Sequence, residues 1–359
     1  MENRVSIAQV ASHANVSAMT VSRVVRGRKH LVSADTYERV LASLHELNYV
    51  PTRSSFQNRH VETSTIGYVP HDLEVPHNRI DSLTLEGLCQ TARRHGYDVL
   101  ILLRDEADWM VNRQIVRFLD RRSDGFIILS PRRGEWHEML EMLTEQEIPV
   151  VICYRRDVPE GIAWVDPDNG EVMRLAVAHL AEHGHSQVAL LVGPSPTQKS
   201  SSPEFVKQSG VHDHFDDIER ERYFRGFVDE FCQSGSRSPI VRVLDDNWKL
   251  LPGTIELLLG QKITGIVCGD HIALQLWDEM DAAGLKVPDD FSIVGVDNMA
   301  EAAHRGLSSV AFGYEEVGRL AVQAWVELCG GKAARECCKV VPVRLIQRQS
   351  VARPRLSQP

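Results

Sequence analysis

The sequence lacks a long apolar run, a signal segment and paired cysteines. No stretch of its 359 residues approaches the roughly 20 consecutive apolar residues that a membrane helix needs. Its first residues do not show the basic-then-apolar order of a secretory signal. Seven cysteines are present, but none forms a C-x-x-C pair. We therefore expect reduced thiols, a cytoplasmic location and no contact with a membrane.

Motifs for catalysis, metal binding and nucleotide binding are also missing. The sequence contains no G-x-S-x-G, no H-E-x-x-H and no dinucleotide-binding fingerprint. Residues 193–200, "GPSPTQKS", approach a phosphate-binding loop, but Gln198 replaces its glycine and two prolines remove backbone donors. The histidines of "HDHFDD" have no second ligand cluster at a set spacing. The sequence thus predicts a protein that is not an enzyme and that holds neither a metal nor a cofactor.

Charge is distributed unevenly along the chain. Residues 1–60 contain eight Lys or Arg against four Asp or Glu, a balance of +4. Since the whole chain carries −9, the remainder carries −13. A basic module on an acidic body suggests that only the module meets a polyanion. The length exceeds what one core supports, so we expect about two or three domains.

Residues 1–50 show three short helical patterns and form the first predicted domain. A serine, which is a favoured N-cap residue, precedes each pattern: Ser6, Ser17 and Ser33. Apolar stripes follow at helical spacing: Ile7, Val10 and Ala11; Val21, Val24 and Val25; Tyr37, Val40, Leu41, Leu44 and Leu47. Asn15, between the first two patterns, tolerates the left-handed conformation of a tight turn. The three patterns predict a helix-turn-helix.

The second helix would place its polar face in the major groove of DNA. Arg23 can donate two hydrogen bonds to a guanine edge, and Ala18 and Met19 can contact thymine methyl groups. The other candidates for DNA contact are Ser6, Ser17, Thr20, Ser22, Arg26 and Ser33. A three-helix module that docks a protein stays open as the alternative.

The same segment resembles the headpiece of the LacI/GalR family of bacterial transcription regulators. The matching pieces are "VA..A.VS..TVSRV", "VS..T...V" and "LNY.P". Asn15 stands where the family often has a glycine. The resemblance implies a homodimer that binds a pseudo-palindromic operator in double-stranded DNA. It also implies control by a small-molecule effector, most often in the regulation of carbohydrate genes.

Residues 51–63 correspond to the hinge of that family. The resemblance implies a short helix that forms on the operator and inserts a leucine into the minor groove. Arg53 matches the family pattern, but Asn58 stands where the leucine is expected. Because an apolar side chain is needed to unstack bases, Asn58 is a poor wedge. Arg53 and Arg59 can still reach phosphates or a narrow minor groove, Asn58 is kept as a candidate for DNA contact, and a linker without DNA contact stays open as the alternative.

Short apolar strands alternate with amphipathic helices from Thr65 onward. The predicted strands are "TIGYVP", "YDVLILL", "DGFIILS", "IPVVICY", "QVALLVG", "TGIVCG" and "FSIVGVD". Such alternation predicts parallel sheets covered on both faces. The region resembles the effector domain of the same family, which is similar in fold to periplasmic sugar-binding proteins. We expect two lobes in 64–348, a tail at 349–359 and an insertion at 195–221. The lobes are approximately 64–164 plus 305–325, and 165–304 plus 326–348.

Polar and aromatic residues near the strand ends are the candidates for effector binding, because ligands bind at the carboxyl ends of such strands. They are Asp72, Arg155, Tyr223, Trp248, Asp270 and Asp297. Carboxylates beside a ring face suit a sugar, since its hydroxyls need acceptors and its C–H face needs apolar cover. The resemblance implies an arginine where Tyr223 stands, so the usual partner for an acid or phosphate is absent and a neutral or modified sugar is favoured. A capping, ion-paired or core role stays open for each residue.

The sequence therefore predicts an all-α helix-turn-helix headpiece joined to an α/β effector domain of two doubly wound lobes. The function that fits is a cytoplasmic, homodimeric, DNA-binding transcription regulator, a repressor of carbohydrate-related genes under a sugar or sugar-derived effector. A soluble sugar-binding protein without a gene-regulatory role is the alternative from another class.

Overall fold

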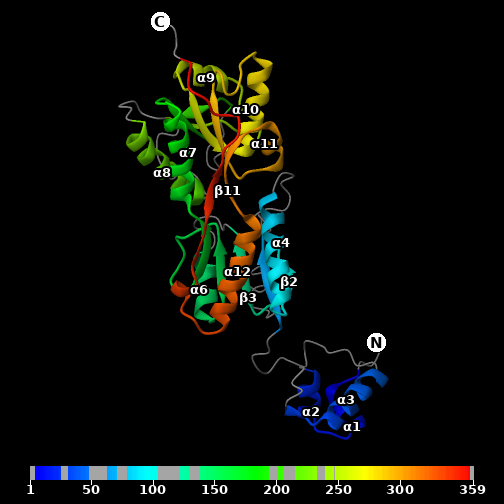
Figure 1. Ribbon diagram of the computed structural model, residues 1–359. Helices are drawn as coiled ribbons and strands as arrows, with labels where there is room; N and C mark the ends of the chain where they lie inside the picture. The colour runs from blue at the N-terminus through cyan, green and yellow to red at the C-terminus, as the bar shows by residue number, and fades with distance from the viewer. Residues whose placement is uncertain are drawn as a thin grey trace. The chain divides into compact units, whose positions relative to one another are not determined.

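The computed structural model divides the chain into two units, Met1–Glu62 and Thr63–Pro359. It describes residues 5–25, 31–47, 63–70, 79–103, 122–129, 137–193, 201–205, 215–232, 239–245 and 247–355. Figure 1 shows a small helical unit and a larger unit of helices and sheets.

The first unit contains α1 (Ile7–His13), α2 (Ala18–Val25) and α3 (Ala34–Glu46). Its buried core consists of Val10, Ala11, Ala14, Val21, Val24 and Val40. Asn15 has a φ of 52°, so the tight turn between α1 and α2 uses the left-handed conformation that its side chain tolerates. The expectation for Leu41 was wrong: it is 39% exposed, because it follows the buried Val40 directly and is rotated about 100° away from it.

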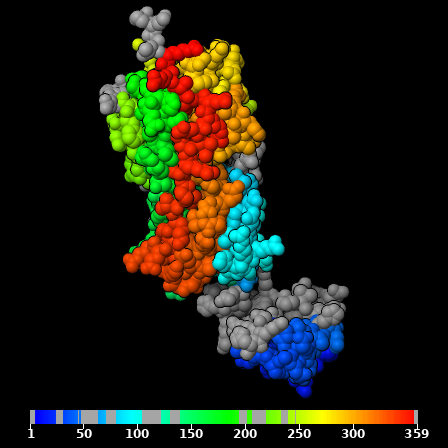
Figure 2. Space-filling model, viewed as in Figure 1, coloured from blue at the N-terminus to red at the C-terminus, as the bar shows by residue number. Residues whose placement is uncertain are grey.

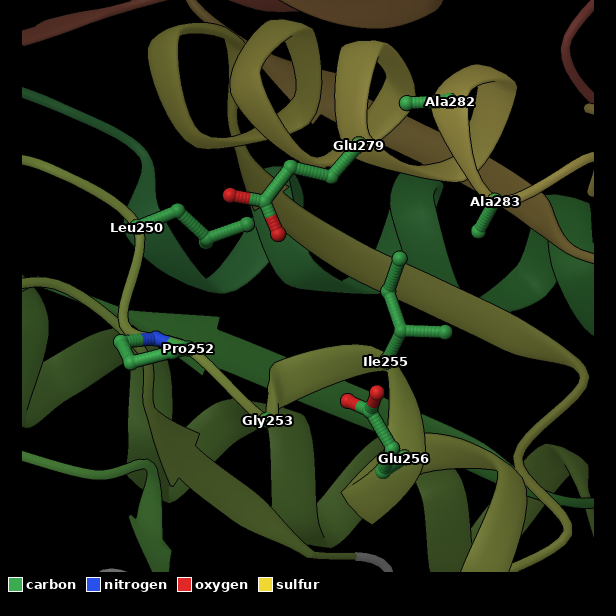
Figure 3. Close-up of a pocket in the computed structure, with 8 residues that line it drawn as sticks. All are labelled: Leu250, Pro252, Gly253, Ile255, Glu256, Glu279, Ala282 and Ala283. Atoms are coloured by element: carbon green, nitrogen blue, oxygen red, sulfur yellow. The ribbon is translucent and has the colours of Figure 1, made fainter.

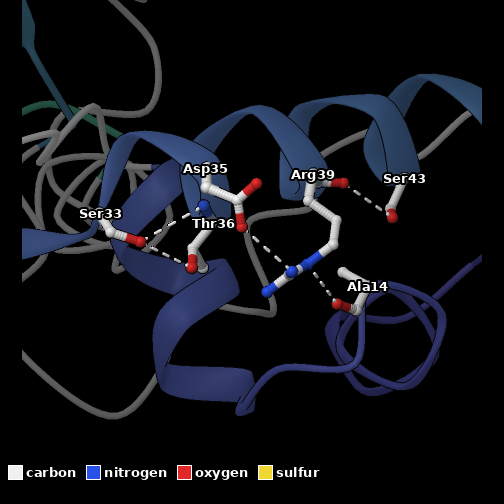
Figure 4. Close-up of polar contacts among 6 residues, drawn as sticks. All are labelled: Ala14, Ser33, Asp35, Thr36, Arg39 and Ser43. Carbon is white, nitrogen blue, oxygen red and sulfur yellow. Dashed lines mark hydrogen bonds and ion pairs between the residues drawn. The ribbon is translucent and has the colours of Figure 1, made fainter.

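Polar contacts fix α3 against the turn, as Figure 4 shows. Arg39 donates from Nε to the carbonyl oxygen of Ala14 at 3.1 Å, and its Nη1 lies 3.3 Å from Asp35 Oδ2. The backbone nitrogen of Thr36 donates to Ser33 Oγ at 3.4 Å, so Ser33 caps α3 as expected. The helix-turn-helix is therefore closed by a small apolar core and by one arginine that crosses between helices.

The first lobe of the second unit holds a six-stranded sheet in the order β12-β5-β4-β3-β1-β2, and all its pairings are parallel. Its strands are β1 (Thr65–Val69), β2 (Asp98–Ile101), β3 (Gly125–Leu129), β4 (Val150–Cys153), β5 (Ala163–Pro167) and β12 (Lys339–Val341). Its helices are α4 (Arg79–Arg94), α6 (His137–Glu145), α12 (Tyr314–Cys329) and α13 (Ala334–Cys337).

Both faces of this sheet are covered, as the continuous apolar strands predict. Along β3, Ile127 and Leu129 join the core that contains α4 and α12 side chains, whereas Phe126 and Ile128 join the core that contains α6 side chains. Figure 2 shows α4 and α12 side by side, and they form extensive contacts. Glycine makes this approach possible, because a Cβ on Gly318 would lie 2.0 Å from the carbonyl oxygen of a residue in α4.

The second lobe holds a seven-stranded sheet in the order β13-β11-β10-β9-β6-β8-β7. Its strands are β6 (Val188–Val192), β7 (Glu204–Phe205), β8 (Ile240–Arg242), β9 (Gly265–Gly269), β10 (Ser292–Val296), β11 (Ser308–Phe312) and β13 (Val343–Ile346). Its helices are α7 (Asn169–Glu182), α8 (Phe215–Phe231), α9 (Thr254–Gly260), α10 (Asp270–Ala282) and α11 (Ala300–Arg305). Among the strands that the structure describes in this sheet, the edge strands β7 and β13 pair antiparallel and the others pair parallel.

Two segments belong to the opposite lobe from the one expected. β11 lies within 305–325, yet it pairs with β10 in the second lobe. β12 lies within 326–348, yet it pairs with β5 in the first lobe. Both strands are short or contain polar residues, so the sequence shows no continuous apolar run there. The chain therefore passes between lobes close to 168, 313 and 342, and α12 starts at one of these crossings.

Candidate functional site

Helix α2 presents the candidate base-reading residues on its outer face. Val21 and Val24 are buried, whereas Met19 is 63% exposed and Ala18 is also exposed. Arg23 is partly exposed, and its Nη2 donates to the sulfur of Met19 at 3.6 Å. This weak contact holds the guanidinium over the first turn of the helix. The structure therefore brings Ala18, Met19 and Arg23 together on one face.

Serine hydroxyls hold the N-termini of the headpiece helices. The backbone nitrogen of Thr20 donates to Ser17 Oγ at 3.1 Å, and the side-chain oxygens of Thr20 and Ser17 are 2.9 Å apart. Ser6 forms a reciprocal capping box with Gln9. The hydroxyls of Ser6, Ser17 and Ser33 thus have a capping role, and their contact with DNA stays a prediction. Ser22 is partly exposed on α2.

Some candidate residues lie outside the described part of the chain, and for them the assignment stays a prediction. They are Arg26, Arg53, Asn58 and Asp72.

The strand ends of the two sheets meet around Tyr314. The hydroxyl of Tyr314 donates to Oδ1 of Asp297, which follows β10, at 2.7 Å. The Tyr314 ring centroid lies 6.3 Å from that of Tyr154, which follows β4 in the first lobe. The ring of Phe312 packs edge-on at 4.8 Å. Burial raises the pKa of the Tyr314 phenol well above its ordinary value, and the Asp297 carboxylate raises it further, so this phenol stays a hydrogen-bond donor.

Trp248 and Asp297 lie at the same edge of the second sheet. The Trp248 ring is 5.5 Å from that of His271, and the Trp248 residue is 38% exposed. A Cβ on Gly269 would lie 2.9 Å from the His271 ring and 3.8 Å from Asp297 Oδ2. A Cβ on Gly193 would lie 3.4 Å from the Trp248 ring. The carboxyl ends of β6, β9 and β10 therefore carry an exposed indole, an imidazole and a carboxylate close together.

Asp270 has a different role from the one expected. It has no exposed surface, and its Oδ2 accepts from the backbone nitrogen of Met299 at 2.6 Å. Its Oδ1 accepts from Ser309 Oγ at 2.8 Å. Burial, followed by the charge of Asp297, raises the pKa of the Asp270 carboxyl to about 8. Asp270 thus helps to hold the loop that contains Asp297, through its hydrogen bonds with Met299 and Ser309.

Arg155 and Tyr223 are engaged with their own neighbours. Arg155 is 6% exposed, and it pairs with Asp157 through Nε at 2.5 Å and through Nη2 at 3.0 Å. The Tyr223 ring on α8 stacks with Phe227 at 6.3 Å, and the Arg222 guanidinium lies 4.8 Å from its centroid. Among the predicted effector residues that the structure describes, Asp297 and Trp248 lie near each other at one edge of the second sheet, and their role in effector binding stays a prediction.

Arg220 and Tyr314 were missed by the sequence analysis. Arg220 donates from Nε to Oδ1 of the buried Asn169 at 3.0 Å. Its positive charge lowers the pKa of the Tyr314 phenol, against the larger effect of burial. Arg220 precedes Tyr223 by three residues and therefore shares its side of α8. That spacing was the available signal for Arg220, whereas nothing in the local sequence marks Tyr314.

A surface groove lies elsewhere on the second lobe, between α9 and α10. It has a volume of about 460 Å³, and Figure 3 shows its lining residues. They are Leu250, Pro252, Gly253, Ile255, Glu256, Glu279, Ala282 and Ala283. Desolvation and the neighbouring Glu256 raise the pKa of the exposed Glu279. None of the predicted effector residues lines this groove.

The described ranges contain neither a metal-binding cluster nor a membrane-spanning helix. No group of three or more His, Cys, Asp or Glu side chains there is arranged to hold a metal ion. No helix in that part of the chain combines the length and apolarity that crossing a bilayer requires.

A helix-turn-helix unit followed by a two-lobed α/β domain with polar strand ends defines a ligand-responsive DNA-binding regulator. Residues 6–52 match the model of bacterial regulatory proteins of the lacI family. Residues 63–208 match periplasmic binding proteins and the sugar-binding domain of the LacI family, and residues 177–351 match a periplasmic binding protein-like domain. The chain belongs to the LacI family of bacterial regulatory proteins.

Curated relatives agree with this assignment over nearly their full length. The chain is 27% identical to the HTH-type transcriptional regulator MalR of Streptomyces coelicolor, covering 96% of each chain. It is 27% identical to the HTH-type transcriptional repressor PurR of Vibrio parahaemolyticus, over 90% of this chain and 91% of the relative. It is 25% identical to the lactose operon repressor of Escherichia coli, over 98% of this chain and 91% of the relative.

Solved structures share the fold. The lac repressor dimer bound to operator and the anti-inducer ONPF superposes with a TM-score of 0.74 at 24% identity, covering 98% of this chain and 100% of that one. The complex of the transcriptional regulator CelR with cellobiose superposes with a TM-score of 0.65 at 23% identity, covering 97% of this chain and 100% of that one. The expected combination of headpiece and two-lobed effector domain is confirmed.

Proposed function

We propose that this DNA-binding regulator represses carbohydrate-related genes, with α2 as the base-reading helix and a sugar or sugar derivative as the effector. The observation that carries the proposal is the arrangement at the second sheet, where the exposed Trp248 ring and the Asp297 carboxylate share one edge. A ring face and a carboxylate together match the C–H face and the hydroxyls of a sugar.

Helix α2 has the properties of a major-groove reader. Its buried valines anchor it to the headpiece core, so that Ala18, Met19 and Arg23 form its outer face. A guanidinium can form two hydrogen bonds with a guanine, whereas Ala18 and Met19 offer apolar contacts to thymine methyl groups. We infer that Arg23 contributes most of the base discrimination.

A dimer is supported by the apolar surface of the first lobe. Ile80 on α4, Ile101 at the end of β2 and Leu103 beyond it are 37%, 42% and 58% exposed. α4 packs against β2, so these side chains belong to neighbouring elements. Exposed apolar residues on adjacent elements are typical of a surface covered in an oligomer. We infer that a second copy of the chain covers them, which gives two headpieces for a two-fold operator.

The cellular location follows from the DNA partner. Operator DNA lies in the bacterial cytoplasm, so we propose that the chain acts there, and we propose that it is not an enzyme. The named curated relatives are transcriptional regulators and repressors, which supports both statements. A sugar-binding protein without a gene-regulatory role would leave the headpiece unused.

The DNA-binding part is tested with duplexes selected by the full chain from a random library. Arg23→Lys keeps the charge but loses the planar fork, so it should retain non-specific binding and lose about 1–3 kcal/mol of sequence discrimination. Arg23→Gln should weaken both the non-specific binding and the sequence discrimination. If the two variants select the same sequences as the wild type with unchanged affinity, α2 is not the base-reading helix.

A further inference from the structure

Tyr314 occupies a position that neither the fold nor the effector proposal explains. We propose that Tyr314 is a positioning residue, whose hydroxyl holds Oδ1 of Asp297 so that Oδ2 is presented to a hydroxyl or amine proton of the effector. The choice of effector rests on the proposed function, whereas the orientation of Asp297 does not.

The backbone at Asp297 needs such support. Its φ is 111°, a conformation that residues with a side chain rarely adopt and that persists only where neighbours hold it. Two backbone nitrogens hold the loop in part: that of Asp297 donates to the Val310 carbonyl oxygen at 3.0 Å, and that of Asn298 donates to the side-chain oxygen of Ser309 at 3.0 Å. The Tyr314 hydroxyl adds a third anchor to the loop through the Asp297 side chain, at 2.7 Å, so losing it should loosen the same backbone amides.

The second carboxylate oxygen lies close to the carboxyl end of β9. Asp297 Oδ2 lies 3.8 Å from where a Cβ on Gly269 would be, beside the His271 ring. Trp248 lies beyond His271 and is partly exposed. A proton donor on a ligand that stacks on Trp248 would therefore find a charged acceptor there, and hydrogen bonds to charged acceptors are stronger than neutral ones.

Tyr314 is itself held from the first lobe. Its ring packs 6.3 Å from that of Tyr154, whose hydroxyl lies 2.6 Å from Thr84 Oγ1 on α4. Tyr314 is 6% exposed and is the first residue of α12. Since packing fixes the ring, the Tyr314 hydroxyl has a defined direction. The Asp297 carboxylate is therefore hydrogen-bonded to a residue that lies where the chain passes between the lobes.

A ligand-free experiment tests the orientation. Hydrogen–deuterium exchange is measured on the full chain, on Tyr314→Phe and on Tyr68→Phe. Tyr68 is the matched control, because it is fully buried and its hydroxyl donates to the Asp81 carbonyl oxygen at 3.3 Å, within the first lobe. Loss of a hydrogen bond to a carboxylate should speed exchange of the Asp297, Asn298 and Met299 amides about tenfold in Tyr314→Phe, and not in Tyr68→Phe. Unchanged exchange at these amides in Tyr314→Phe overturns the proposal.

A ligand experiment separates positioning from a merely structural role. Glucose, ribose, maltose and cellobiose are screened by thermal shift, and a sugar that stabilises the wild type is then titrated by calorimetry. Tyr314→Phe should raise its Kd about tenfold, and adding it to Asp297→Asn should cause no further loss, since both act through one carboxylate. Equal Kd in wild type and Tyr314→Phe overturns the role in binding. If no sugar stabilises the wild type, the proposed effector class fails, and the exchange result still decides the orientation of Asp297.

Discussion

Replacing Gly318 by alanine should loosen the packing of α12 on α4. The new Cβ would lie 2.0 Å from the Thr84 carbonyl oxygen and 2.7 Å from the Leu88 nitrogen, both backbone atoms of α4. Ordinary contact starts at 3.4 Å, so the helices must separate by about 1.4 Å or distort. Overpacking of this kind costs about 3 kcal/mol, and the higher helix propensity of alanine returns about 1 kcal/mol. We therefore expect a net loss of about 2 kcal/mol in the free energy of unfolding.

Gly226 provides the matched control for this substitution. It lies in α8, and a Cβ there would meet nothing within 4 Å. Gly226→Ala should therefore gain about 1 kcal/mol from helix propensity alone. Urea unfolding followed by circular dichroism compares the two variants, whose difference isolates the steric cost. If Gly318→Ala is as stable as Gly226→Ala, α4 and α12 do not approach each other as described.

Two further predictions concern the caps and the buried histidines. Ser17→Ala removes the oxygen that accepts from the Thr20 nitrogen at 3.1 Å, so the headpiece should lose about 1 kcal/mol in its thermal unfolding, and an unchanged midpoint would contradict the capping role. His179 and His185 are 5% and 2% exposed, and burial lowers the pKa of both. The unfolded chain therefore binds protons more readily, so stability should fall as the pH drops below about 6.5. His185→Gln should make the fall in the free energy of unfolding between about pH 6.5 and 5 less steep. An equally steep fall in the variant would contradict the role of His185 in the pH dependence.

The headpiece was largely predictable because its determinants are local. Serine caps, the buried Val21 and Val24 and the turn at Asn15 act within a few residues of one another, and the structure confirms them. The prediction for Leu41 was wrong because Leu41 and its neighbour Val40 are both apolar. The sequence alone does not show which of the two is buried, and the packing of the helices decides it.

The effector site was predictable only in part. The sequence placed Asp297 and Trp248 near strand ends, and the structure has them at one edge because parallel strands bring their carboxyl ends together, while their part in effector binding stays a prediction. Asp270 meets the same rule, but its side chain turns beneath the loop at Met299 instead of facing the edge. Tyr314 was missed because its contacts with Asp297 and Tyr154 arise from tertiary packing at a crossing between lobes.

The central claim is that DNA reading and effector response belong to separate sets of residues in one regulator. The most direct measurement titrates a stabilising sugar into the full chain bound to a selected duplex and follows fluorescence anisotropy. We predict that sugar changes wild-type DNA affinity, that Asp297→Asn keeps the DNA affinity and loses the response, and that Arg23→Gln loses the DNA affinity and keeps sugar binding. A sugar response that survives Asp297→Asn, or specific DNA binding that survives Arg23→Gln, would contradict the account.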